Sequence, residues 1–167
     1  MMTSRFLAII ALTTLTVGSC ASVGGKAPAP NVKITEYGIY ELNLVGAVEN
    51  SDAPKSTVLQ SDTFRLVEKA TTVKIAKGLS FGISYILDEP GSGSIEIVRK
   101  IVHPQYYDPY SKRNLTEYVS KRTLKPGELD HQAYQLTEDF EMVAGKWSFQ
   151  LWYAGQLLAQ QTFYLTR

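Results

Sequence analysis

Hydrophobic and polar residues alternate most regularly near the end of the chain, between Gly145 and Leu165. In the first half of this stretch, every second residue is large and apolar: Trp147, Phe149, Leu151 and Tyr153. Ala154 and Gly155 interrupt the alternation as a two-residue turn does, and it resumes on one phase at Leu157, Ala159, Gln161, Phe163 and Leu165. A period of two is typical of a half-buried strand, so the stretch predicts a β-hairpin covered by a second sheet. We expect Trp147, Phe149 and Leu151 to be buried, and Trp152 to lie on the other face.

Shorter stretches of the same kind precede the hairpin. They predict strands over residues 32–45, 59–67, 71–76, 79–87, 95–102, 115–124 and 132–136. Gly38 lies inside the first and suggests a bulge there, and Arg99 interrupts the apolar phase of Ile95, Ile97 and Ile101. No convincing amphipathic helix follows the first thirty residues. Short strands separated by Gly and Pro predict an all-β sandwich of two antiparallel sheets with about 7–9 strands.

The first residues follow a different pattern. Arg5 precedes an apolar run of twelve residues from Phe6 to Val17, which is too short to span a bilayer but suits a signal peptide. The next residues, Val17-Gly18-Ser19-Cys20, resemble a bacterial lipobox. That resemblance implies cleavage before Cys20, a diacylglycerol thioether on its sulfur and an acyl chain on its new amino group. The alternative is an ordinary signal peptide with an unrelated cysteine.

We therefore expect three parts: a signal peptide over residues 1–19, a lipidated Cys20 with a flexible tether over 20–31, and a folded domain over 32–167. Two or more acyl chains hold a protein firmly at a membrane. Ala21 follows the cysteine in place of the aspartate that favours retention in the inner membrane. The expected location is the bacterial cell envelope, most simply the outer membrane facing the periplasm.

Composition narrows the classes of partner. Removal of the first 19 residues leaves 148, with 16 basic and 16 acidic side chains. A net charge of zero gives no reason to expect a nucleic acid partner. A domain of this size needs neither a disulfide nor a structural metal to bury a sufficient core.

Catalytic and metal-binding patterns are weak. A zinc site made of His103, His131 and a carboxylate such as Asp108 is conceivable, but the spacing does not favour it. No nucleophile with a matching base is evident, and the carboxylates at 138, 139 and 141 suit a solvated edge. We expect no cofactor and no enzymatic activity, with an unrecognised hydrolase as the alternative.

Charge is segregated in the second half of the chain. Residues 99–125 hold seven basic side chains and two acidic ones, whereas residues 126–141 hold five acidic side chains and no Lys or Arg. Residues 103–113 are expected to be irregular, which is long for a hairpin connection. The candidate binding residues there are Tyr106, Tyr107, Tyr110, Lys112 and Arg113. The competing interpretation is that the charges pair between neighbouring strands and the tyrosines cap the sheet.

Several segments resemble one family, called DUF3859, a domain of unknown function found mainly in proteobacteria. The segments are Glu36–Tyr40, Thr71-Thr72 ahead of Gly78 and Phe81-Gly82, and Gly145–Tyr153 with Gly155 and Leu158-Ala159. The resemblance covers most of the stretch from Lys33 to Leu165, and it departs from the family at Ala144, where proline is usual. It implies an immunoglobulin-like fold and carries no activity, catalytic residue or ligand.

The function expected from these features is binding. The first expectation is an interaction or assembly module for an envelope protein, attached to the membrane by its lipid. The second is a glycan- or peptidoglycan-binding module that uses residues 103–113.

Overall fold

Strands account for most of the described residues. The computed structural model describes residues 29–49, 53, 57–89 and 93–167. The described residues form one short 3-10 turn, η2 (Asp139–Glu141), and nine strands: β1 (Val32–Glu49), β2 (Thr57–Glu68), β3 (Thr72–Lys74), β4 (Ser80–Leu87), β5 (Ile95–Asp108), β6 (Arg113–Leu124), β7 (Leu129–Gln135), β8 (Gly145–Tyr153) and β9 (Gln156–Thr166).

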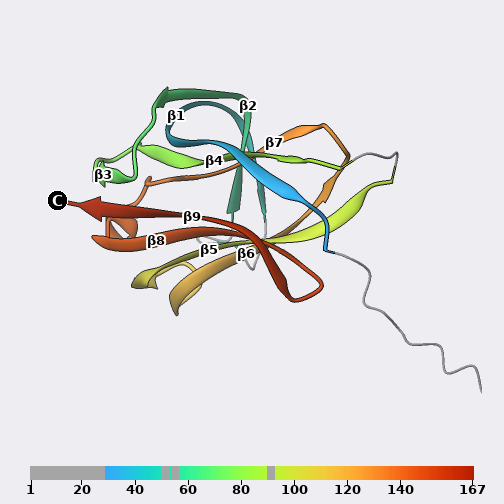
Figure 1. Ribbon diagram of the computed structural model, residues 1–167. Coiled ribbons are helices and arrows are strands. Elements are labelled where there is room, and N and C mark those ends of the chain that lie inside the picture. The colour runs from blue at the N-terminus through green and yellow to red at the C-terminus, as the bar shows by residue number, and fades with distance from the viewer. Residues whose placement is uncertain (1–28, 50–52, 54–56, 90–92) are drawn as a thin grey trace, which may run out of the picture.

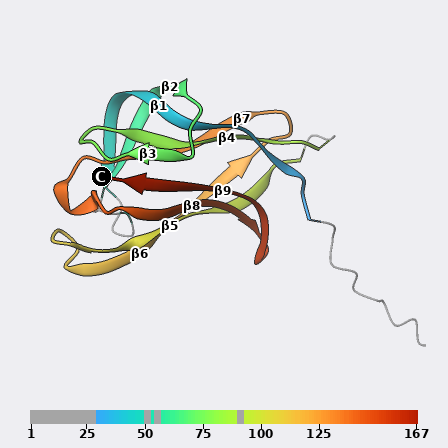
Figure 2. The ribbon, with the colours of Figure 1, turned by 60° about the vertical axis from the view of Figure 1, so that its left-hand side comes forward.

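The strands build two stacked sheets (Figure 2). One has the order β2-β1-β4-β7 and the other the order β3-β9-β8-β5-β6. All pairings are antiparallel except that of β3 with β9. The predicted antiparallel sandwich is therefore confirmed. Within the described part of the chain, no helix is both long and apolar enough to cross a membrane.

Two expectations about the segment after Ile95 are wrong. β5 continues to Asp108, and β6 begins at Arg113, so the irregular connection covers only residues 109–112 rather than 103–113. Pro104 lacks a backbone N–H, but a register shift between Val102 and Tyr106 leaves it outside the ladder. A bulge thus carries the strand past a residue that normally ends one.

The closing hairpin follows its predicted phase up to the turn. Trp147, Phe149 and Leu151 are fully buried, whereas Trp152 is half-buried on the other face. Ala154 and Gly155 have φ of 46° and 79°, the left-handed values that a two-residue hairpin turn requires.

The predicted inward-facing phase of the returning strand, β9, is wrong at Leu157. The register of β8 and β9 shifts after the Leu151 pairing, so Trp152 pairs with Leu157 while Leu151 pairs with Ala159. The extra residue turns Leu157 outward, where it is 41% exposed, while Phe163 and Leu165 remain in the core as predicted.

The core is centred on Phe81 of β4. Its ring meets the rings of Trp147, Phe149 and Phe163 edge-on, with centroids 5.4–5.6 Å apart. These four side chains come from both sheets and are all fully buried. Edge-to-face contacts are the favoured arrangement of aromatic rings, so the cluster fixes the spacing between the sheets.

A histidine is packed into the same core. His103 is 4% exposed and stacks between Tyr106 and Trp147. Its Nδ1 lies 2.9 Å from the carbonyl oxygen of Pro104, which can only accept, so Nδ1 carries the proton. Nε2 is buried without a partner, and burial lowers the pKa of the ring from its usual 6.5.

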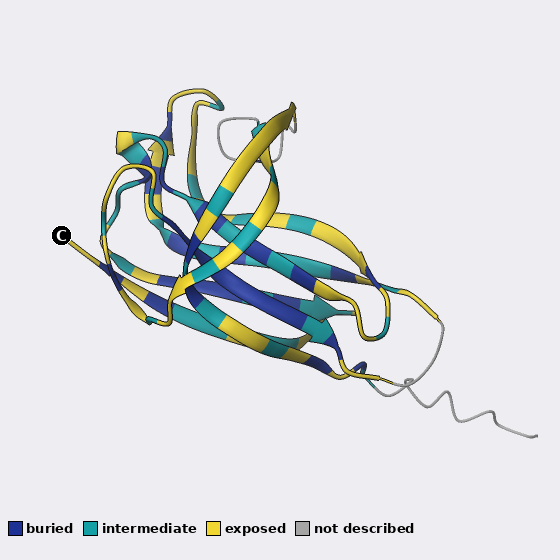
Figure 3. Ribbon diagram, turned by 90° about the horizontal axis from the view of Figure 1, so that it is seen from above, coloured by how far each residue is buried: buried dark blue, intermediate teal, exposed yellow. Residues whose placement is uncertain are grey.

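Half of the β1–β2 hairpin leaves the sandwich. β1 pairs with both β4 and β2 near Ile39 and Tyr40, but from Glu41 onward it pairs only with β2. We call residues 41–49 and 57–65 the arm. Two further register shifts bend it. It runs from the upper sheet toward the lower one in Figure 1, and it crosses over the other strands in Figure 3.

Gly38 permits the first bend. Its φ is 149°, and a Cβ there would lie 2.0 Å from the carbonyl oxygen of Glu68 on the neighbouring strand. The register shift follows at the next residue, as the glycine suggested. The predicted signal peptide over residues 1–19, Cys20 and all but the last residues of the tether over 20–31 lie outside the described residues.

Replacement of Trp147 by alanine is expected to lower the free energy of unfolding by about 3–5 kcal/mol, because it leaves a cavity beside Phe81. Urea denaturation measures the loss. Trp152→Ala is the matched control and should cost about 1 kcal/mol, since that ring is half-buried on the outer face. A larger loss for Trp152→Ala than for Trp147→Ala would contradict the packing.

Unfolding should also depend on pH through His103. Its pKa is lower in the folded protein, so its contribution is complete above pH 6.5 and decreases as the pH falls below that value. The slope attributable to this one group can reach about 1.4 kcal/mol per pH unit. Urea denaturation between pH 5.5 and 7.5 should give a shallower dependence for His103→Gln than for the native chain. Equal slopes would show that His103 is not held neutral.

Candidate functional site

The turn between β5 and β6 exposes four of the five predicted binding residues. Tyr107 is 54% exposed and Tyr110 is 60% exposed, and Lys112 and Arg113 are exposed beside them. We call residues 107–113 the tip. Tyr106 is only 5% exposed and points into the core, so it cannot belong to a contact surface.

A buried carboxylate holds the backbone of the tip. Asp108 is 0% exposed, and its Oδ1 accepts the backbone N–H of Tyr110 at 2.9 Å. Its Oδ2 accepts the Ser111 hydroxyl at 2.8 Å, and Lys112 takes a left-handed φ of 54°. Side-chain bonds of this kind fix a tight turn. The tip therefore presents its two tyrosines on an ordered backbone.

Tyr106 belongs instead to a chain of buried hydroxyls. The Tyr134 hydroxyl donates to Glu141 Oε1 at 2.8 Å, so Tyr106 donates to Tyr134 at 2.9 Å. Glu141 Oε2 accepts the backbone N–H groups of Thr137 and Glu138, both at 3.0 Å. The expectation of a solvated edge is wrong for Glu141, which is 0% exposed and closes the end of the sandwich. Burial raises the pKa of Tyr106 and of Tyr134.

Part of the basic segment is paired within its own sheet. Lys121 meets Glu96 at 2.9 Å and Lys100 meets Glu117 at 3.7 Å, both between β5 and β6. Here the interpretation as cross-strand pairs is the right one. Such exposed pairs stabilise little.

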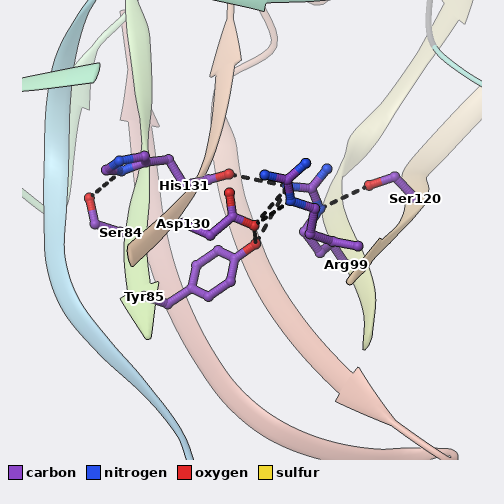
Figure 4. A network of polar contacts seen from close by, with 7 residues as sticks. Ser84, Tyr85, Arg99, Ser120, Asp130 and His131 are labelled. Carbon is purple, nitrogen blue, oxygen red and sulfur yellow. Dashed lines mark hydrogen bonds and ion pairs between the residues drawn. The ribbon is translucent and has the colours of Figure 1, made fainter. Parts of the chain in front are cut away.

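The residue that interrupts the apolar phase of β5 has a different role. Arg99 lies between Ile97 and Ile101 on the core-facing side, and its side chain is 19% exposed. Its Nη1 donates to the carbonyl oxygen of His131 at 3.1 Å and approaches the Tyr85 hydroxyl at 3.4 Å. Its Nε donates to Ser120 Oγ at 3.3 Å. Figure 4 shows these contacts joining both sheets.

Asp130 is the acidic centre of the same network. Its Oδ2 accepts the Tyr85 hydroxyl and Arg122 Nε, each at 2.8 Å, and lies 3.9 Å from Arg99 Nη1. The hydrogen bond to Asp130 raises the pKa of Arg122, and burial raises the pKa of Tyr85. One carboxylate therefore faces two guanidinium groups, and Arg122 has the shorter contact.

His131 lies on the other side of β7, beneath the arm. Its Nδ1 is 2.9 Å from Ser84 Oγ, which bonds the Tyr40 hydroxyl at 2.8 Å. The ring of Phe64, from the arm, stacks on it with centroids 4.7 Å apart. Burial lowers the pKa of this histidine. The stacking fastens the arm to the strand at the opposite edge of its own sheet.

Two adjoining cavities lie where the arm passes the β7 edge and approaches β5 and β6; together we call them the cleft. The first has a volume of about 110 Å³ and is lined mainly by apolar side chains, among them Leu42, Leu44 and Ile101. The second has a volume of about 140 Å³ and is more polar, with Arg99 and Gln132 in its wall. The full set of polar side chains in that second wall is Arg99, Tyr118, Ser120, His131 and Gln132.

Gln132 is the least satisfied group in the cleft. It is 5% exposed, and both its Nε2 and its Oε1 are buried without a hydrogen-bond partner. Most buried side-chain amides in proteins are bonded, so this one is an exception, and its two polar atoms are too deeply buried to be reached from the cavity.

The described residues give no support to a metal site. Within them, no three His, Cys, Asp or Glu side chains gather as metal ligands would. His103 is stacked inside the core and His131 lies beneath the arm, so the conceivable set with Asp108 does not assemble.

Sequence reasoning found the tip but missed the cleft. The available signal was Arg99, a charged residue on a core-facing phase, which requires a buried partner. The partner, Asp130, comes from the other sheet and could not be named without the pairing of the strands.

Comparison with known proteins places the chain in a family. Residues 29–165 match the family model described as "Domain of unknown function (DUF3859)". No match was found among curated protein sequences.

Solved structures show the same fold. An immunoglobulin-like protein from Pseudomonas aeruginosa superposes with a TM-score of 0.59 at 24% identity, over 84% of this chain and 100% of that chain. At this identity the likeness shows the fold alone. The Pseudomonas fluorescens alkylpurine DNA glycosylase AlkC, bound to DNA containing an abasic site analogue, has a TM-score of 0.36 at 12% identity, over 58% of this chain and 28% of that chain. That likeness is too low to carry an argument. With its immunoglobulin-like sandwich and a match that spans residues 29–165, the chain belongs to the DUF3859 family, a domain of unknown function.

Proposed function

We propose that this protein is a non-enzymatic binding module of the bacterial cell envelope that contacts an envelope protein through the tip. The observation that carries the proposal is the exposure of Tyr107 and Tyr110 on a turn that the buried Asp108 holds in place. Tyrosine offers a large amphipathic contact area with few rotatable bonds, and it is enriched among residues that dominate binding energy. A preordered turn loses little entropy on binding.

The basic side chains of the tip suit an acidic surface on the partner. Lys112 and Arg113 are exposed beside the two tyrosines. Complementary charges at the rim of an interface accelerate association and select the partner. A glycan or peptidoglycan strand is the alternative ligand, because tyrosine rings also stack on sugars.

The second part of the proposal is that a lipid attaches the protein to a membrane. The apolar run from Phe6 to Val17, followed by Val17-Gly18-Ser19-Cys20, supports lipidation of Cys20 and anchoring to a membrane, most simply the outer membrane on its periplasmic side. A tether of about ten residues would let the tip reach a partner near that membrane.

Lipidation predicts that Cys20→Ser abolishes metabolic labelling with a radioactive fatty acid and releases the protein from the membrane fraction. The cause is the loss of the only thiol in the chain that can carry the thioether. The control is Ser22→Ala, two residues further on, which should leave labelling and membrane attachment unchanged. Undiminished labelling of the Cys20→Ser protein would refute the assignment.

Binding through the tip predicts a specific photocrosslink in living cells. A photoreactive amino acid at position 107 should give one discrete protein adduct, which Tyr110→Ser with Lys112→Asn should abolish. The asparagine suits the left-handed φ at position 112, so the melting temperature should hardly change, as is usual for surface substitutions.

The control position is Gln160, an exposed residue on the outer face of β9, which should give no such adduct. An adduct at position 107 that disappears on muramidase digestion would favour the glycan alternative. An adduct that persists in the Tyr110→Ser, Lys112→Asn protein would remove the tip as the contact surface.

A further inference from the structure

We infer that the cleft beneath the arm is a second binding site, independent of the tip, for a small amphipathic carboxylate whose head group meets Arg99 and Ser120. The inference rests on three features of the cleft: a guanidinium nitrogen left over from the Asp130 network, a serine hydroxyl beside it, and an apolar continuation of matching size.

The hydrogen bonds of Arg99 leave one of its guanidinium nitrogens without a partner in the described part of the chain. Arg122 makes the short contact with Asp130 at 2.8 Å, and Arg99 remains at 3.9 Å. The Nε and Nη1 groups of Arg99 bond to neutral oxygens of Ser120, His131 and Tyr85. Its Nη2 has no partner among the described residues, and Arg99 lines the polar cavity. A carboxylate is the natural partner for a planar, permanently charged group of this kind.

Ser120 supplies a second donor in the same wall. It lines the cavity that Arg99 lines, and its hydroxyl proton is free to rotate toward the head group because Ser120 Oγ acts as acceptor toward Arg99. A carboxylate has two oxygens, so one can accept from Arg99 and the other from Ser120.

The apolar continuation sets the size of the ligand. The two cavities share six residues in their walls, so they adjoin: Val58, Leu59, Phe64, Ile101, Tyr118 and Ala133. A cavity of about 150 Å³ holds one benzene molecule, so the pair has room for a ligand of roughly 10 non-hydrogen atoms. The mainly apolar wall of the first cavity suits a phenyl ring or a short acyl chain.

A water-soluble acid of that size is a suitable probe. The full chain, held in lipid nanodiscs, is titrated with 4-phenylbutyrate and, separately, with the neutral 4-phenyl-1-butanol. Calorimetry against empty nanodiscs corrects for uptake into the lipid. The native chain should bind the acid saturably and prefer it to the alcohol by about tenfold or more, as expected for a charged hydrogen bond.

Two variants distinguish binding of the acid in the cleft from a general effect of positive charge on the protein. Arg99→Gln should abolish the preference for the acid over the alcohol. Lys100→Gln is the matched control, since it removes the same charge one residue along β5 but on the outer face, where Lys100 meets Glu117 and the Trp152 ring. It should keep the preference.

If Arg99→Gln does not fold, Ser120→Ala tests the same site while the arginine stays in place. It should weaken binding of the acid by about tenfold, because one donor to the head group is lost, and leave binding of the alcohol nearly unchanged. The inference is overturned by an absence of saturable binding, by equal affinity for acid and alcohol, by equal losses in Arg99→Gln and Lys100→Gln, or by unchanged binding of the acid in Ser120→Ala.

Discussion

The fold depends on the contact of Phe81 with the aromatic residues of the opposite sheet. Trp147, Phe149 and Phe163 surround its ring edge-on, and none of these side chains reaches solvent. Burial of four such rings is a large apolar contribution, because each aromatic side chain removes about 150–250 Å² from water. The contact sets the distance and rotation between the sheets.

The position of the aromatic core explains where the buried polar groups lie. The aromatic cluster fills the middle of the sandwich, so the buried carboxylates of the described residues lie around it, at the ends and at the β6–β7 edge. At one end, Glu141 accepts two backbone N–H groups and the Tyr134 hydroxyl; at the β6–β7 edge, Asp130 receives Tyr85 and Arg122. A buried carboxylate is tolerated only with such partners, because loss of its hydration is costly. The same requirement brings Arg99 inward and leaves one edge of its guanidinium for the cleft.

The two proposed sites differ in how they are built. The tip is local: its residues are consecutive, and the carboxylate that holds the turn is Asp108, within the same segment. The cleft is made of the arm, of β7 and of β5 with β6, which are remote in the sequence. An immunoglobulin-like sandwich with a bent hairpin laid across one edge can thus present a rigid convex contact and a concave one at once.

The sequence by itself determined the sandwich, the family and the buried face of the closing hairpin. It also placed Tyr107 and Tyr110 at the surface, but it wrongly placed Tyr106 there with them. These features depend on period-two alternation and turn residues, which act over a few positions. It could not determine where bulges fall: the register shift around Pro104 extended β5, and the one after Leu151 turned Leu157 outward. Only the tertiary structure paired Arg99 with Asp130 and laid the arm over His131. The reason is physical: bulges and buried ion pairs depend on groups that meet across strands, and one sequence does not say which strands those are.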